Sequence, residues 1–94
     1  MKHHIIVKFQ SQVTNKPALY QDIGALFQKA YDVQGVHSVS LHPNVTDRPN
    51  RYDLMIVIDM DQDKLPLFDA SQVHHEWKDR YSSIIEQKAI FDCD

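Results

Sequence analysis

The segment YDLMIVIDM, residues 52–60, carries apolar side chains at both alternating positions of a strand. One face of such a strand is apolar throughout, and the other is apolar in its middle, at Met55 and Val57. A strand of this kind needs cover on both sides. Because 94 residues are too few to cover a sheet twice, we expect a second copy of the chain to pack on the face that the helices leave open.

The residues before this segment predict a strand, a helix and a second strand. Alternating apolar residues indicate a strand over 2–10. Apolar residues at three- and four-residue steps indicate a helix over 15–33, with Thr14 as its N-cap and Gly35 ending it. Residues 36–42 are typical of a strand, and the polar stretch PNVTDRPNR that follows predicts a loop.

The residues after the segment predict two helices and a last strand. The acidic DQD favours a helix start, so we expect a short helix over 64–69. Ser71 is the expected cap of a longer helix that reaches residue 87, and its buried stripe comprises Val73, Trp77, Tyr81, Ile84 and Ile85. A final strand is expected over 88–92, with Ala89, Phe91 and Cys93 on one face and Ile90 on the other.

The predicted order of elements is β-α-β-β-α-β. It is typical of the ferredoxin-like α+β fold, a four-stranded antiparallel sheet with both helices on one face. We expect residues 1–94 to form a single domain of this kind.

Charge and composition narrow the classes of partner. The chain carries a net charge of −3 and ten scattered Lys and Arg residues, which argues against nucleic acid or an anionic membrane surface as the main partner. Its single cysteine, Cys93, allows no internal disulfide, and no apolar run is long enough to span a membrane. We therefore expect a cytoplasmic protein.

Several stretches, in order along the whole chain, resemble the stress-responsive dimeric α/β-barrel (Dabb) family. They are Lys2-His3, Ile5-Ile6-Val7-Lys8-Phe9, Gly35-Val36-His37-Ser38-Val39, Asn44-Val45, Tyr52-Asp53-Leu54, the segment from Ala70 to Trp77, and Ile90-Phe91-Asp92. The resemblance implies a homodimer in which two ferredoxin-like sheets face each other and close an α/β barrel. Most relatives have no assigned reaction; olivetolic acid cyclase, a polyketide cyclase, is the best understood enzyme among them.

Two histidines are the candidate catalytic residues. The family's second-helix pattern, His-Pro-x-His-x-x-Phe, places its second histidine on His74 and its aromatic on Trp77, with Ser71-Gln72 in place of His-Pro. The strand-one histidine of the family falls on His3, and the cyclase tyrosine falls on Phe68, which has no hydroxyl. An imidazole at position 74 can exchange a proton near neutral pH or hold a carbonyl group. The alternative is a structural histidine, hydrogen-bonded beneath the helix.

The sequence leaves the function open among three classes. The first is binding of a small apolar or aromatic molecule in a helix–sheet cleft lined by Ile5, Val7, Leu54, Ile56, Phe68 and Trp77. The second is a lyase of cyclase type with His74 as general acid and base, and the third is a non-catalytic oligomer. The same aromatic residues can instead fill the core, together with Phe27, Tyr31 and Tyr81.

No metal or cofactor is expected. The HExxH-like stretch that begins at His75 has Asp79 in place of its second histidine, so the pair of imidazoles that binds zinc is missing. The acidic stretch that begins at Asp59 has Lys64 at the turn glycine of a calcium loop and Ala70 at its glutamate. The chain also contains no glycine-rich phosphate loop.

Overall fold

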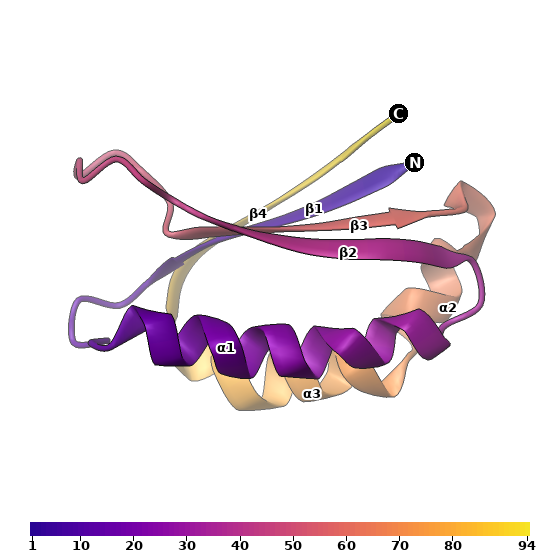
Figure 1. Ribbon diagram of the computed structural model, residues 1–94, viewed down its shortest axis with the longest axis horizontal. Helices are drawn as coiled ribbons and strands as arrows, with labels where there is room; N and C mark the ends of the chain where they lie inside the picture. Colours follow the sequence, from indigo (N-terminus) through magenta and orange to yellow (C-terminus); the bar gives the residue numbers. More distant parts are fainter.

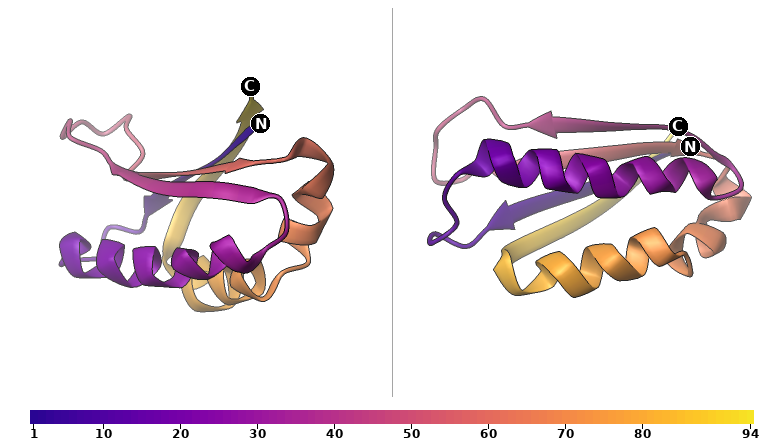
Figure 2. Two further views of the ribbon diagram at one scale, coloured as in Figure 1. Left: turned by 45° about the vertical axis from the view of Figure 1, so that its right-hand side comes forward. Right: turned by 60° about the horizontal axis from the view of Figure 1, so that its bottom comes forward.

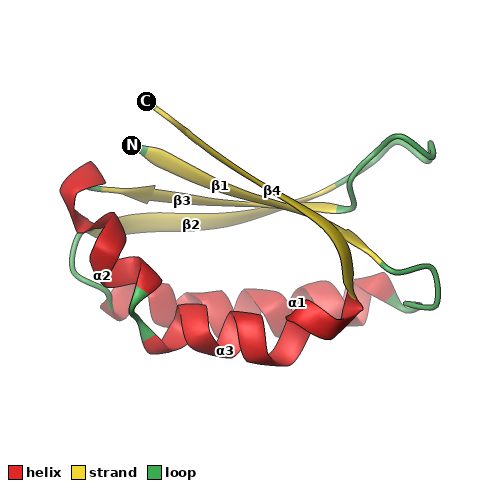
Figure 3. Ribbon diagram, turned by 180° about the vertical axis from the view of Figure 1, so that it is seen from behind, coloured by secondary structure: helices red, strands yellow, loops and turns green.

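The computed structural model, which covers residues 1–94, is a four-stranded antiparallel sheet with all helices on one face (Figures 1 and 3). The strands are β1 (Lys2–Phe9), β2 (Val36–Pro43), β3 (Leu54–Met60) and β4 (Ile85–Cys93), in the order β2-β3-β1-β4. The helices are α1 (Lys16–Phe27), α2 (Leu65–Asp69) and α3 (Gln72–Tyr81), and 3₁₀ turns cover Gln28–Asp32, Gln62–Lys64 and Ser82–Ile84. The predicted ferredoxin-like α+β fold is confirmed.

Strand β3 has one closed face and one face without cover from its own chain. Leu54, Ile56, Ile58 and Met60 point toward the helices and are at most 1% exposed. Met55 and Val57 point to the opposite face and are only half-buried. Figure 2 shows that no helix lies over that opposite face. The alternation predicted for residues 52–60 therefore divides a packed core from an open sheet surface.

The start of α1 differs from the prediction. Asn15, not Thr14, is the N-cap, with a left-handed backbone (φ 51°) and no capping bond from its side chain. Asn adopts this conformation more readily than a β-branched residue. Pro17 also removes one of the two first-turn amides that a capping side chain could reach, so a Thr14 cap would have little to bond.

The second long helix is shorter than predicted. It ends at Tyr81, and a 3₁₀ turn leads into β4, which starts at Ile85 rather than at residue 88. The apolar pair Ile84 and Ile85 fits a helical period, but Ile85 pairs with Phe9 of β1, and sheet pairing overrides the helix. Ser71 caps α3 as predicted, because its Oγ accepts a hydrogen bond from the His74 amide at 3.4 Å.

Tyr31 does not belong to the core. Its side chain is 47% exposed, and its hydroxyl accepts a hydrogen bond from the Val39 amide at 3.2 Å. Strand β2 lies at the edge of the sheet, so this amide has no partner on a further strand. The tyrosine thus completes the hydrogen bonding of an edge strand, which its helical spacing alone could not indicate.

Gly35 has the predicted left-handed backbone, with φ +91°. The predicted helix over 15–33 is shorter, because α1 ends at Phe27, a 3₁₀ turn follows to Asp32, and Val33 is already extended. A side chain at position 35 would be strained, and its Cβ would also clash with Cγ of Lys64 and come within 2.6 Å of Lys64 Cβ. We expect Gly35→Ala to lower the free energy of unfolding by about 1–3 kcal/mol, measured by urea denaturation.

Gly24 provides the matched control. It lies inside α1, and an added Cβ would meet only Leu41 Cδ2, at an ordinary 3.8 Å. Gly24→Ala should leave stability unchanged or raise it by about 0.5–1 kcal/mol. Equal destabilisation by both substitutions would show that the positive φ of Gly35 is not required.

Candidate functional site

His3 pairs with Asp92 where the first and last strands run side by side. The register of β1 and β4 sets the two residues opposite each other, and His3 Nδ1 lies 2.5 Å from Asp92 Oδ1. His3 points to the helix side of the sheet and is 6% exposed, whereas the Asp92 side chain is 41% exposed. The carboxylate therefore orients the imidazole from the solvent side.

Phe68 of α2 brings the two candidate histidines into one cluster. Its ring contacts His3 edge to face at 5.8 Å between centroids and His74 at 5.5 Å. The Ser71 hydroxyl donates to the Phe68 carbonyl at 2.6 Å and accepts from the His74 amide, so one side chain joins α2 to α3. Both imidazoles thus lie against one buried phenyl ring, with no hydrogen bond between them; His3, Phe68, His74 and Asp92 form what we call the histidine cluster.

His74 has an unused hydrogen-bonding atom. Its Nδ1 is buried and makes no hydrogen bond of good geometry, although the Asp69 backbone lies close enough to raise the pKa of the ring slightly. Burial lowers the pKa of His74 below its ordinary value of 6.5, and the nearby Asp69 offsets only part of that effect. At neutral pH the ring is therefore an uncharged imidazole, able to accept or donate one hydrogen bond to a bound molecule.

The six residues predicted to line a ligand pocket lie in the closed core. Each is at most 2% exposed: Ile5, Val7, Leu54, Ile56, Phe68 and Trp77. Of three cavities in the structure, one touches Leu54 and none touches the other five. Ile90 lies opposite Ile5 on the helix side of the sheet and is 50% exposed. Their role as a ligand pocket stays a prediction.

Sequence reasoning missed two members of this region. Asp92 is 89 residues from His3 in the chain. Ile90 lies two residues before Asp92 on the same face of β4 and pairs with Ile5. Antiparallel pairing of the first and last strands of a ferredoxin-like sheet could have placed both residues beside β1. Their exposure could not be inferred, because it depends on how far α3 extends under β4.

No group of three or more His, Cys, Asp or Glu side chains lies together as metal ligands would. None of the helices is long and apolar enough to cross a membrane.

Solved structures share this fold at low sequence identity. No family model matches the chain, and no curated protein matches it. A dimeric ferredoxin-like protein of unknown function from Thermobifida fusca aligns with a TM-score of 0.79 and 13% identity, over 96% of this chain and 85% of that one. A Dabb family protein with a ferredoxin-like fold from Mesorhizobium loti aligns at 0.74 and 12%, over 99% and 93%.

A hydroxynitrile lyase from Passiflora edulis also aligns, with a TM-score of 0.74 and 12% identity, over 96% of this chain and 87% of the lyase. The resemblance to the Dabb family is thereby confirmed at the level of the fold. At such identities the likeness does not carry an activity from one protein to another.

The burial of His74 predicts a pH dependence of stability. Because the folded chain binds the His74 proton less tightly than the unfolded chain, the free energy of unfolding should fall as the pH drops below 6.5 and through the lowered pKa. The His74→Gln variant cannot take up this proton, so it should lose less stability than the wild type between pH 7 and pH 5. Urea denaturation at a series of pH values measures the difference.

The titration of the His74 Cε1 proton in NMR spectra provides the independent check. Its midpoint should lie below 6.5 and should rise in Phe68→Ala, which removes the ring that covers the imidazole. A midpoint above 6.5 in the wild type would contradict the assignment of His74 as a desolvated, neutral imidazole.

Proposed function

We propose that this chain is a homodimeric α/β-barrel protein of the Dabb type that binds a small apolar or aromatic molecule at the histidine cluster. The buried, unpartnered Nδ1 of His74 is the observation that carries the binding site. A buried polar atom without a partner costs about 1–3 kcal/mol, and a ligand that supplies the missing partner recovers it. The half-exposed Ile90 supplies accessible apolar surface for such a molecule, and the buried Phe68 ring beside His74 would have to be uncovered by side-chain movement.

The open sheet face supports the dimer. Its apolar residues are neighbours across the strands, since Ile6 lies opposite Met55 on one side and Ala89 on the other. Phe91 on the same face is 61% exposed, and its ring lies edge to face with His4. Burying one large apolar side chain stabilises by about 1.5–3 kcal/mol, so a second copy on this face gains from several such residues. The protein from Thermobifida fusca is itself described as dimeric.

We propose that the dimer works in the cytoplasm and binds neither nucleic acid nor a membrane surface. The net charge of −3 and the single cysteine, Cys93, support this assignment.

A charge at the centre of the open face tests the dimer. Val57→Asp would bury an unpaired carboxylate from each copy in the proposed interface, and we expect it to give a folded monomer. Light scattering after size-exclusion chromatography gives the mass, and circular dichroism reports the fold.

Ala25→Asp adds the same charge on the exposed surface of α1 and should remain dimeric. Should Val57→Asp unfold, Phe91→Ser on the edge strand offers a milder test of the same face. A monomeric wild type, or a dimer that persists in Val57→Asp and in Phe91→Ser, would refute the interface.

Ligand binding is tested with 4-hydroxybenzaldehyde, a small aromatic molecule whose carbonyl can accept a hydrogen bond from His74. We expect saturable shifts in the amide resonances of residues 68–74 and of Ile90. His74→Ala should weaken binding by roughly ten-fold or more, because it removes the polar partner. His75→Ala is the matched control, since His75 follows on the same helix, is exposed, and lies beside the His74 ring. Equal affinity of both variants, or no saturable shift in the wild type, would leave the non-catalytic oligomer as the better account.

Acid–base catalysis of lyase type is the second candidate. It is favoured by the lowered pKa of His74, which keeps a free base beside the apolar ring, and a hydroxynitrile lyase shares the fold. Such a base removes the hydroxyl proton of a cyanohydrin while the C–CN bond breaks, which yields a carbonyl compound and cyanide. The same two variants decide this candidate: cyanide release from mandelonitrile should be abolished in His74→Ala and retained in His75→Ala.

A further inference from the structure

The loop between β2 and β3 encloses the largest cavity of the structure. This cavity, of about 470 Å³, lies between the loop, the end of β1 and the first turn of α1. We call it the loop cavity. Its charged lining residues are Lys8, Lys16, Arg48, Arg51, Asp47 and Asp53.

The charge of the loop cavity opposes that of the chain. Four cations and two carboxylates line it, whereas the whole chain carries a net charge of −3. In the sequence the ten Lys and Arg residues look scattered, but the fold gathers four of them around one hollow. A concave surface with one sign of charge in excess concentrates ions of the opposite sign.

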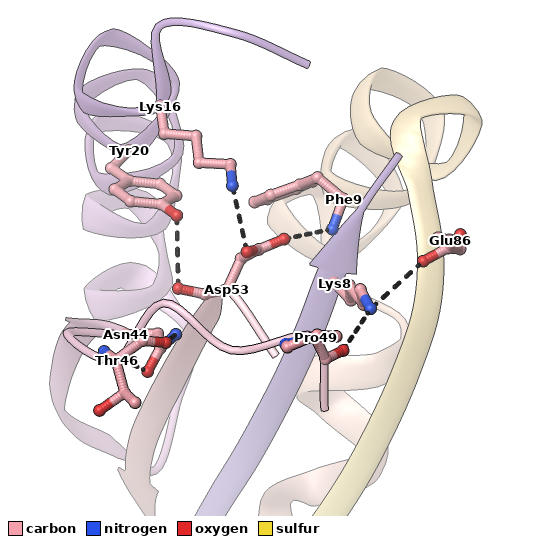
Figure 4. Close-up of polar contacts among 9 residues, drawn as sticks. All are labelled: Lys8, Phe9, Lys16, Tyr20, Asn44, Thr46, Pro49, Asp53 and Glu86. Atoms are coloured by element: carbon pink, nitrogen blue, oxygen red, sulfur yellow. Dashed lines mark hydrogen bonds and ion pairs between the residues drawn. The ribbon is translucent and has the colours of Figure 1, made fainter. Parts of the chain in front are cut away.

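Asp53 lies in the wall of the loop cavity and forms an ion pair with one of the four cations, Lys16. Its carboxylate accepts hydrogen bonds from the Phe9 amide at 2.7 Å and from Lys16 Nζ at 3.2 Å (Figure 4). Its backbone carbonyl accepts a bond from the Tyr20 hydroxyl at 3.3 Å. Burial, and secondarily Asp53, raises the pKa of Tyr20, so that hydroxyl keeps its proton. Lys16 thus balances the charge of the Asp53 carboxylate, whose role is to hold β1 and α1 together.

The loop itself is held in place by hydrogen bonds. Asn44 and Thr46 exchange two bonds between side chain and backbone, at 2.6 and 3.1 Å (Figure 4). Lys8 Nζ donates to the Pro49 carbonyl at 3.0 Å and lies 3.8 Å from Glu86. The Arg51 amide donates to the Arg48 carbonyl at 3.2 Å. The walls of the loop cavity are therefore formed before any ligand arrives.

Two guanidinium groups remain without an anionic partner. Arg48 makes no side-chain hydrogen bond or ion pair, and Arg51 donates only to the neutral amide oxygen of Asn50, at 2.7 Å. The guanidinium fork matches the two oxygens of a carboxylate or phosphate group. A pair of such groups beside a preformed hollow is suited to a small oxyanion.

We propose that the loop cavity binds a small molecule through its phosphate or carboxylate group, held by Arg48 and Arg51. Lys8 adds positive charge at the edge of the site while it anchors the loop through Pro49. The site is distinct from the histidine cluster, because His3 and Lys8 are separated by five residues of β1, or about 17 Å.

The test is an NMR titration at constant pH and constant ionic strength, with inorganic phosphate in one arm and citrate in the other. We expect saturable shifts confined to residues 44–53, Lys8, Lys16 and Tyr20, and the arm with the tighter binding identifies the preferred oxyanion. Arg48→Gln and Arg51→Gln should each weaken binding roughly ten-fold, as the loss of a charge-assisted hydrogen bond requires. Arg80→Gln is the matched control, since it removes the same charge from α3, where Arg80 lies over the Tyr81 ring.

Unchanged affinity in Arg80→Gln and in His74→Ala, with loss in both loop variants, would support the loop cavity as a separate site. Equal weakening by Arg48→Gln and Arg80→Gln would reduce the effect to net charge and overturn the proposal. Absence of saturable shifts in both arms would overturn it as well. Amide spectra unchanged outside the loop verify that each variant is folded.

Discussion

Strand β3 packs against the helices of its own chain with one face, and no helix of that chain covers its other face. Its helix-side residues are fully buried. Because β1 and β2 pair with β3 on its two edges, this burial also fixes the position of the sheet against the helices. The opposite face keeps Met55 and Val57 half-exposed beside Ile6. All three helices of this small chain lie on one side of the sheet, and the apolar residues of the other side are available for a second copy to cover.

The same sheet also carries the two polar regions at its opposite ends. At one end the first and last strands bring His3 to Asp92, and Phe68 extends that pair to His74. At the other end Asp53, directly before β3, ties the loop to β1 and α1. One run of residues, 52–60, thereby supplies both the centre of the core and the anchor of the loop cavity.

The two ends of the sheet differ in charge because their side chains differ in exposure to solvent. The imidazole of His74 is uncharged at neutral pH because burial disfavours its protonated form. The guanidinium groups of Arg48 and Arg51 lie on an exposed loop, and neither makes an ion pair. The first environment suits an apolar molecule with one polar group, and the second suits an oxyanion, so the two regions call for different ligands.

The sequence by itself determined the order of elements, the helix-side core of β3, the left-handed Gly35 and the Ser71 cap, because each is encoded by neighbours a few residues apart. Only the tertiary structure decided the rest. Ile85 fits a helical period but pairs with Phe9 in the sheet. The Tyr31 side chain lies outside the core, against the edge strand β2. Asp92 reached His3 across 89 residues, and four cations from β1, α1 and the loop came to surround one cavity. These outcomes depend on strand register and loop path, which packing between distant segments sets and local periodicity does not record.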